Sequence, residues 1–492
     1  MDDGRRCDYN GLPIRNLMTE PTKTCDRATQ RTALAVSTLA GFLTPFMGSA
    51  VNVALPAIAA EFSLKTVSLG WVATAYILAA AVFLVPLGRL ADIRGRKKFF
   101  LLGVSLFTGA SVLAATAPSA AALIAFRALQ GLGGAMIFGT SMAILTSVFP
   151  PGERGKAIGI STAAVYLGLS LGPVLGGFLV HRFGWRSVFV AVVPVGLAGV
   201  VLTLTQLHGE WDEARGEKFD AAGSVVFGLG LAGLMYGFSR LPSLFGAGLV
   251  AAGLALLGAF ILWEKRVPAP VLDVRLFRAN RVFAFSNAAA LVNYSATSAV
   301  SFLLSLYLQY VKGLPPQKAG LVLVAQPVVM ALFSPLAGKA SDRIEARIVA
   351  SAGMAFSSAG LFALVFLGPA TPIGFIIAAL LGLGFGFALF SSPNTNAVMG
   401  SVERRAFGVA ASTLGTMRLT GQMLSLGISV LIIALFVGNV RIGPAEHPLF
   451  LRALRVAFAV FGSLCVLGVF ASLARGNGQG RGKATEGGRL PN

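Results

Sequence analysis

A charged turn between two long apolar runs holds the densest group of ionisable side chains in this sequence. It reads Gly88-Arg-Leu-Ala-Asp-Ile-Arg-Gly-Arg-Lys-Lys98, and a shorter copy, Gly338-Lys-Ala-Ser-Asp342-Arg343, returns in the second part of the chain. Asp92 follows an apolar helix whose C-terminal end is already negative, so its carboxylate requires cationic or N–H partners. The turn therefore predicts a site at which one acid selects among several donors.

Two kinds of donor are within reach of Asp92. Neighbouring arginines follow it in the turn, and the start of the apolar run after Arg405 would offer backbone N–H groups from the other part of the chain. We interpret the turn as a clasp that joins two halves of the molecule, against the alternative of a basic turn that only sets membrane topology. The predicted latch residues are Gly88, Arg89, Asp92, Gly95, Arg96 and Asp342.

Arg127 and Arg418 stand well inside apolar runs. A guanidinium within a membrane is costly unless it faces a cavity or a partner, so Arg127 and Arg418 mark candidate functional positions. The alternative is that each side chain snorkels to an interface. Arg127 has no counterpart in the second part of the chain, where Ala378 takes its place.

The elements that must position these groups are membrane helices. The chain has 492 residues, of which 55% are hydrophobic and 12% charged, with mean hydropathy +0.77; ordinary soluble domains carry about 25% charged residues. Fourteen apolar runs are long enough to cross a bilayer, and each must be helical there, because only a helix satisfies its own backbone groups. The runs are 34–56, 70–90, 98–117, 121–147, 157–180, 187–206, 221–238, 244–264, 282–310, 319–339, 348–368, 372–391, 406–437 and 453–474.

The basic excess is explained by topology. With the N-terminus in the cytoplasm, most of the 40 Lys and Arg residues fall on the cytoplasmic side, which places both termini there. The polar first 32 residues contain no cleavable signal peptide, so the first span serves as the targeting signal. No nucleic-acid partner is expected, and the bilayer is the predicted environment. Cys7, Cys25 and Cys465 suggest neither a disulfide framework nor a metal site, and no cofactor is expected.

The chain is a duplication with an insert. The two turns match, as do Gly131-Leu-Gly133 with Gly382-Leu-Gly384 and Glu153-Arg154 with Glu403-Arg404. The spacing between copies exceeds six helices by about one hairpin, so the fold expected is an all-α polytopic membrane protein of six, two and six spans. The predicted divisions are an N-terminal tail (1–32), a first half (33–208), a linker with two extra spans (209–281), a second half (282–474) and a disordered tail (475–492).

These motifs resemble the major facilitator superfamily, and in particular its fourteen-span drug:proton antiporter branch. The turn at 88–98 is similar to the superfamily's loop signature, and Arg127-Ala-Leu-Gln130-Gly131 to its second motif. The run Gly168-Leu-Ser-Leu-Gly172-Pro173-Val-Leu-Gly176-Gly177 resembles the exporter signature, and Asn52-Val-Ala-Leu-Pro56 and Pro393-Asn394-Thr-Asn396 resemble the fourteen-span branch. The resemblance implies a monomeric exporter of small amphipathic compounds in a prokaryotic plasma membrane, working by alternating access with the proton as a candidate coupling ion.

The glycine-rich run is also a candidate gate. Proline removes one backbone hydrogen bond and clashes with the preceding turn, so Gly172-Pro173 predicts a kink, whereas the aligned pair in the second half is Gly421-Gln422. A simple packing kink is the alternative. The predicted kink residues are Gly168, Gly172, Pro173, Gly176 and Gly177.

Polar residues on apolar spans are candidates for the transport pathway. Each residue alone more readily forms an inter-helix hydrogen bond, which contributes about 0.6–2 kcal/mol. Together, these residues would line one cavity between the halves. The predicted pathway residues are Asn52, Arg127, Gln130, Tyr166, Tyr294, Gln309, Asn394, Arg418 and Gln422.

No acid lies deep in a predicted span. The fourteen-span branch commonly has an aspartate nine residues before the proline of the Asn-Val-Ala-Leu-Pro run, and Met47 occupies that position. An interior with arginine and without acid disfavours cations, so neutral or anionic amphiphiles are the expected substrates. Two hypotheses stay open: a proton-coupled drug exporter that titrates a peripheral carboxylate such as Asp92 or Glu61, and an exporter of organic anions or of neutral or lipid-linked metabolites with little proton coupling. The sequence lacks the motifs expected of a membrane enzyme, of a channel or of an ATP-driven pump.

Overall fold

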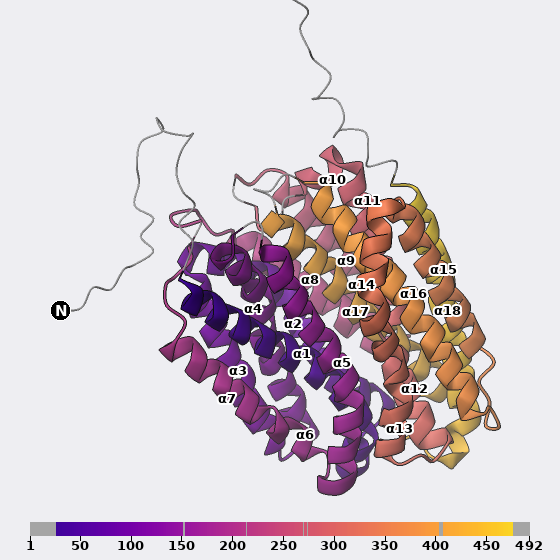
Figure 1. The fold of residues 1–492 in the computed structure, drawn as a ribbon. Helices are drawn as coiled ribbons and strands as arrows, with labels where there is room; N and C mark the ends of the chain where they lie inside the picture. The colour runs from indigo at the N-terminus through magenta and orange to yellow at the C-terminus, as the bar shows by residue number, and fades with distance from the viewer. Residues whose placement is uncertain are drawn as a thin grey trace, which may run out of the picture.

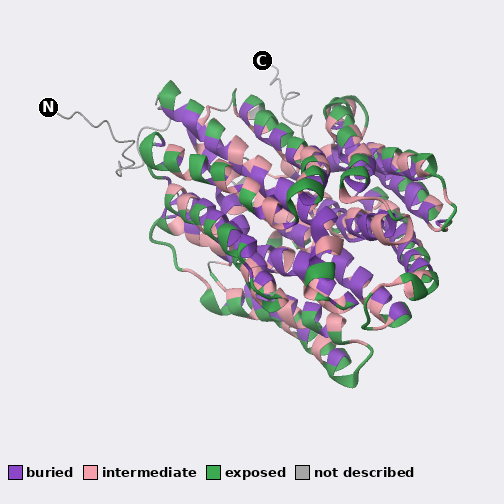
Figure 2. Cartoon of the chain, turned by 90° about the horizontal axis from the view of Figure 1, so that it is seen from below, coloured by how far each residue is buried: buried purple, intermediate pink, exposed green. Residues whose placement is uncertain are grey.

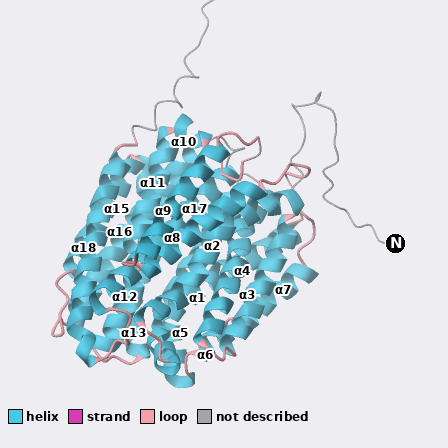
Figure 3. Cartoon of the chain, turned by 180° about the vertical axis from the view of Figure 1, so that it is seen from behind, coloured by secondary structure: helices cyan, strands magenta, loops and turns pink. Residues whose placement is uncertain are grey.

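The computed structural model describes residues 26–150, 153–212, 214–268, 270–272, 274–402 and 407–475. Every regular element in these ranges is helical (Figure 3). The expectations for Cys7, Cys25, the pair Glu403-Arg404 and the terminal tails, and for donors after Arg405, concern residues wholly or largely outside the described ranges.

The described chain contains fourteen helical stretches long and apolar enough to cross a membrane, which confirms the predicted number. The helices are longer than the apolar runs, because polar and interfacial residues continue the backbone hydrogen-bond ladder beyond the hydrocarbon core. The first group of helices is α1 (Arg27–Phe62), α2 (Thr66–Arg94), α3 (Arg96–Ala115), α4 (Ala120–Val148), α5 (Arg154–Phe183), α6 (Arg186–Ala191) and α7 (Val193–Thr205).

The second group repeats this order with more interruptions. A π-helical turn, η1, ends the ninth span, and α13 and α14 share the tenth. The helices are α10 (Arg275–Ala279), α11 (Arg281–Thr297), α12 (Val300–Leu306), η1 (Tyr307–Val311), α13 (Pro316–Leu323), α14 (Ala325–Arg343), α15 (Ala346–Leu364), α16 (Ile373–Gly400), α17 (Phe407–Val437), the short 3-10 helix η3 (Pro444–Glu446) and α18 (His447–Leu473).

The start of α1 and the end of α18 lie at the same end of the bundle, together with α10 (Figure 1). We call this end the terminal face and the other the opposite face. The backbone carbonyl of Ala474 accepts a hydrogen bond from Arg281 Nε at 3.1 Å, so the start of α11 also lies there. The two charged turns, at the ends of α2 and α14, share this face.

The packing of equivalent helices reflects the internal repeat. Gly131 of α4 lies against the backbone carbonyl of Tyr76 on α2, and Gly384 of α16 lies against that of Gln326 on α14. A Cβ at either glycine would overlap the carbonyl oxygen, so both pairs of helices approach closely only because these residues lack a side chain. The buried residues form a core on the inward helix faces, with exposed residues at the periphery (Figure 2).

The hairpin α8 (Ala221–Arg240) and α9 (Leu244–Glu264) packs on the outside of the bundle. α8 contacts α2 of the first group and α17 of the second, whereas α9 packs mainly on α8. Met235 and Phe238 of α8 lie against Gly427 of α17. The hairpin therefore covers one line of contact between the two groups.

Candidate functional site

The carboxylate of Asp92 is held within its own group of helices. It accepts a hydrogen bond from Arg96 Nε at 2.6 Å, and Arg96 Nη1 donates to the hydroxyl of Ser147 on α4, also at 2.6 Å. Gly95 has φ +114°, a conformation that side chains rarely adopt, and it lets α3 begin immediately after α2. The side chain of Asp342 lies outside the described part of the chain.

The segment 207–220, which leads from α7 to α8, packs on this turn. Arg89 of the turn forms an ion pair with Glu217 of the segment. Glu210 Oε1 accepts the backbone N–H of Lys97 at 2.8 Å, so it satisfies one of the free donors at the start of α3. We call this segment the strap, because it lies across the α2–α3 turn.

Backbone hydrogen bonds fix the strap in place. The N–H of Arg96 donates to the carbonyl of Trp211 at 2.9 Å, and the N–H of Ala214 donates to the carbonyl of Asp92 at 3.0 Å. Trp211 is itself buried. The turn at 88–98 therefore has partners both on α4 and in the strap.

Contacts between the two groups of helices close the opposite face. The hydroxyl of Thr66, at the start of α2, donates to the carbonyl of Gly438 at 2.7 Å, and its N–H donates to the carbonyl of Val440 at 3.0 Å. Gly438 and Val440 follow the end of α17. These bonds tie the first residue of α2 in the first group to the segment that follows α17 in the second group.

The glycine-rich run of α5 makes two different contacts. Three of its glycines, Gly168, Gly172 and Gly176, lie against α1 of the same group. Gly177 lies instead against the carbonyl of Pro316 on α13, and the carbonyl of Pro173 lies against Gly320 of α13. The end of the run is thus a close, side-chain-free contact between the halves near the opposite face.

Two predicted pathway residues belong to the same closure. The carbonyl of Asn52 accepts the hydroxyl of Ser305 at 2.7 Å, and Gln309 Nε2 donates to the carbonyl of Val53 at 3.1 Å. Each bond joins α1 to the ninth span. Among the described residues, hydrogen bonds between the two groups lie toward the opposite face or at mid-depth.

A polar and aromatic cluster lies at mid-depth. Ser334 of α14 donates to the hydroxyl of Tyr166 of α5 at 3.1 Å, and Arg418 Nε of α17 donates to the hydroxyl of Tyr294 of α11 at 2.8 Å. The guanidinium lies 5.1 Å from the Tyr294 ring centre, and the ring of Phe387 packs edge-on against Tyr294 at 5.4 Å.

The depth of this cluster follows from helix geometry. At 1.5 Å per residue, its four polar residues lie roughly 14–20 Å along their helices from the terminal face. Tyr166 lies within electrostatic range of Arg418, although the two come from different halves. Tyr166 and Arg418 are half-buried. The cluster therefore joins the halves at mid-membrane and stays partly accessible.

Arg127 has a different environment. It is 1% exposed, its Nε donates to the carbonyl of Val72 at 3.1 Å, and its guanidinium bonds the side-chain oxygen of Gln130 and stacks 4.5 Å from the Tyr76 ring centre. Gln130 in turn donates to the hydroxyl of Ser111 at 2.7 Å. Arg127 and Gln130 thus neither snorkel nor face the other half: they join α2, α3 and α4 inside the first group.

The remaining pathway candidates are separate from the cluster. Asn394 is 2% exposed and donates to the carbonyl of Ser286 at 3.2 Å, inside the second group. Gln422 is half-buried, one turn beyond Arg418 on α17. The sequence therefore named three residues that come together, Tyr166, Tyr294 and Arg418. It missed Ser334, Ser305 and Thr66, because single serines and threonines in apolar spans carry no distinctive signal.

Acids within the described ranges lie at helix ends or in loops. Glu61, next to the end of α1, pairs with Arg186 at 2.6 Å and accepts the indole N–H of Trp185 at 2.7 Å. Glu264, the last residue of α9, accepts the N–H of Leu272 at 3.1 Å. Met47 is fully buried. No three His, Cys, Asp or Glu side chains of the described chain are grouped to hold a metal.

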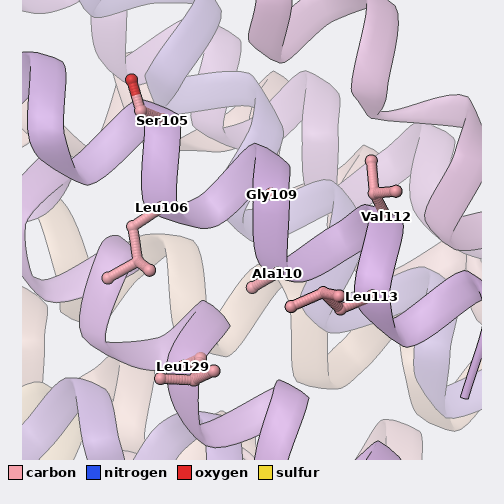
Figure 4. Close-up of a pocket in the computed structure, with 7 residues that line it drawn as sticks. All are labelled: Ser105, Leu106, Gly109, Ala110, Val112, Leu113 and Leu129. Carbon is pink, nitrogen blue, oxygen red and sulfur yellow. The ribbon is translucent and has the colours of Figure 1, made fainter.

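An apolar hollow on the surface of α3 and α4 is separate from these sites (Figure 4). Val112, Leu113 and Leu129 are exposed, Leu106 is half-buried, and Ser105 is its single polar side chain. A lipid-facing surface explains such a lining without a substrate. The lining residues are Ser105, Leu106, Gly109, Ala110, Val112, Leu113 and Leu129.

Comparison with known proteins accords with this architecture. The riboflavin transporter RibZ of Clostridioides difficile strain 630 is 33% identical over 382 residues, which cover 77% of this chain and 82% of that protein. The multidrug resistance protein Stp of Mycobacterium tuberculosis is 34% identical over 391 residues, 77% of this chain and 71% of Stp.

A solved structure of a POT family transporter in complex with a thioalcohol-conjugated peptide superposes with a TM-score of 0.69 at 14% identity, covering 90% of this chain and 95% of the other. These relatives and neighbours are membrane transporters rather than enzymes. The sequence model described as Major Facilitator Superfamily matches residues 37–287 and 286–489. The chain therefore belongs to the major facilitator superfamily of membrane transporters.

Proposed function

We propose that this transporter exports small amphipathic compounds by alternating access. The observation that carries the proposal is the cluster at mid-depth, to which one half contributes Tyr166 and the other Arg418 and Tyr294. A site built from both halves changes its exposure when the halves rock against each other. The names of the relatives, one a multidrug resistance protein and one a riboflavin transporter, support a small-molecule substrate.

In this proposal the bundle has six, two and six spans, with both termini in the cytoplasm of a prokaryote and the chain in its plasma membrane. The terminal face is then cytoplasmic and the opposite face external. The hydrogen bonds of Thr66 and the glycine contact of Gly177 support an external face that is closed, which corresponds to an inward-facing conformation.

The latch acts in the other conformation. In the inward-facing state Asp92 is paired with Arg96 and Arg89 with Glu217, so neither group engages the second half through a described contact. When the cytoplasmic face closes, Asp92 meets the start of α17, and the clasp stabilises the outward-open state. The proposal requires Asp92 to exchange partners during the cycle.

A second candidate function is export of organic anions, or of neutral or lipid-linked metabolites, with little proton coupling. The charges within the spans favour this second function. The described acids lie at helix ends or in loops, and the half-buried guanidinium of Arg418 lies at mid-depth. Proton coupling of the first candidate would need a peripheral carboxylate or the substrate itself as the titrating group.

One assay separates the two candidates. The purified chain in proteoliposomes is screened with cationic, neutral and anionic dyes, while the pH gradient and the membrane potential are imposed independently. Ethidium efflux driven by the pH gradient alone supports the proton-coupled drug exporter. Transport restricted to neutral or anionic compounds supports the second function, and failure to move any small amphiphile contradicts both.

A further inference from the structure

We propose that Arg418, Tyr294 and Tyr166 form a binding subsite for the acidic group, carboxylate or phenolate, of an aromatic organic anion. The inference rests on the proposed export function and deepens it, because it names the chemistry of the substrate and the side chains that recognise it. The three side chains come from α17, α11 and α5, so the subsite spans both halves.

The unused hydrogen-bonding capacity of the cluster consists of donors. Arg418 uses its Nε for Tyr294, and its two terminal nitrogens form no hydrogen bond with a described residue. These terminal N–H groups are free to bind the two oxygens of a carboxylate, a bidentate geometry that guanidinium matches well.

The two phenols add donors of their own. The oxygen of Tyr294 accepts from Arg418, so its hydroxyl proton remains available to a ligand. The hydroxyls of Tyr166 and Ser334 share one hydrogen bond, which uses one of their two protons and leaves the other available. No described residue accepts either of these available protons. A site that offers a cation and two O–H groups recognises an acceptor, and an anion fits it best.

The cluster carries no compensating negative charge. Acids of the described ranges lie at helix ends or in loops, whereas Arg418 lies roughly 16 Å along α17 from its first residue. A guanidinium at this depth is stabilised by an anion and destabilised by a second cation. The ring of Tyr294, with the ring of Phe387 packed edge-on against it, places aromatic surface beside the charge, which suits an aromatic body.

Arg127 does not meet the same conditions. Its Nε and one terminal nitrogen are already bonded to Val72 and Gln130, and its side chain is 1% exposed. Arg418 keeps both terminal nitrogens and part of its surface. Of the two arginines, Arg418 is therefore the one that can exchange a protein contact for a ligand.

The experiment uses two dyes with the same xanthene ring system, the anion fluorescein and the cation rhodamine 6G. Binding to the full-length chain in lipid nanodiscs is followed by fluorescence anisotropy, and transport is followed in proteoliposomes. We expect the wild type to bind fluorescein more tightly than rhodamine 6G. R418Q should weaken fluorescein binding at least tenfold and leave rhodamine 6G binding unchanged or improved, whereas R418K should retain part of the anion preference.

The chain supplies a matched control. Arg240 of α8 stacks on Tyr236 with its guanidinium 5.1 Å from the ring centre and donates to the same phenol, but the pair is exposed on the surface of the hairpin. R240Q and Y236F remove an equivalent pair and should leave both dyes unaffected. Y294F and Y166F should each weaken fluorescein binding several-fold.

The outcomes separate the subsite from the function. If R418Q retains wild-type fluorescein affinity, or if the wild type prefers rhodamine 6G, the subsite is wrong even when transport of small compounds is intact. If the wild type moves no small amphiphile, the export function fails, while the effect of R418Q on binding still decides the subsite. Thermal unfolding of each variant distinguishes a lost contact from a lost fold. Complete loss of the anion preference in an R418K variant that unfolds at the wild-type temperature would also contradict the subsite.

Discussion

Arg89 near the end of α2 forms an ion pair with Glu217 in the strap that leads from the first half to the extra hairpin. The turn that resembles a superfamily signature is therefore neutralised in part by a segment outside the two halves. Glu217 of the strap therefore competes for Arg89 with any partner that the turn has when the terminal face is closed. The balance between the two conformations should then respond to both partners of the turn, Asp92 and the strap.

Asp92→Asn should shift the equilibrium away from the state with a closed terminal face. The substitution removes the charge that pairs with Arg96 and, in the proposed clasp, with α17. A loss of about 1.4 kcal/mol corresponds to a tenfold change in the equilibrium, and we expect transport to fall by about that factor.

Labelling of single cysteines at the two faces measures the effect of D92N. Asp342→Asn is the matched control, because Ile344 and Glu345 dilute the basic cluster of the second turn, and its effect should be smaller. Unchanged labelling at both faces and unchanged transport in D92N would contradict the clasp hypothesis.

Glu217→Gln should have a smaller effect in the opposite direction. The pair is partly exposed, with 51% of the Glu217 side chain accessible, and such pairs contribute about 0.2–1 kcal/mol. Freed from the strap, Arg89 becomes available to the closed latch. The shift should disappear at high salt, which screens exposed charges.

The same cysteine labelling measures this shift. Asp212→Asn is the control, since its exposed pair with Arg215 lies within the strap itself. An equal response of D212N and E217Q would show that the Arg89 contact is not the cause.

Gly320→Ala should prevent full closure of the opposite face. An added Cβ would overlap the carbonyl oxygen of Pro173 in the other half, and overpacking of this kind costs about 1–3 kcal/mol. The variant should populate the state open at the opposite face and transport more slowly. Gly374→Ala is the control, because no atom lies within 4 Å of a Cβ there. Spin-label distances between α5 and α13 provide the measurement, and identical distances in G320A and wild type would contradict the gate.

Arg127→Met should reduce stability without changing the charge preference for substrate. It leaves the buried carbonyl of Val72 and the amide oxygen of Gln130 without their charged donor, and each such bond contributes about 1.5–3 kcal/mol. A lower thermal unfolding temperature and an unaltered ratio of anionic to cationic dye binding are expected. A changed ratio would instead assign Arg127 to the pathway.

The sequence predicted the number of spans because each apolar run reports directly on the hydrocarbon core. It did not predict helix ends: the first run was placed at 34–56, whereas α1 extends from Arg27 to Phe62. Hydropathy falls outside the hydrocarbon, but backbone hydrogen bonds continue into the interface. The same limit explains why Glu61 belongs to a helix and still pairs with Arg186 near a bundle end.

The sequence could not show which side chains of a helix point toward the other half, and this limited the prediction of the site. Arg127 and Arg418 look alike in the sequence, yet one lies inside its own half and the other at mid-depth near the other half. Only tertiary packing separates them, since Gly131 admits α2 close to α4 and leaves Tyr76 beside Arg127. The sequence did not predict the strap for a related reason: the partners of its charged residues lie far away in the sequence.

The contact of α8 with both α2 and α17 has a consequence for the route that a membrane-dissolved compound takes. Because α8 packs on both α2 and α17, the hairpin would keep lipid from the line between these two helices. In the proposed export function, lateral entry from a leaflet on that side would be blocked while α8 stays in place. Amphiphiles that partition into the bilayer would then have to enter on the side of α5 and α14, so the extra hairpin makes a nearly symmetric bundle accept its cargo from one flank.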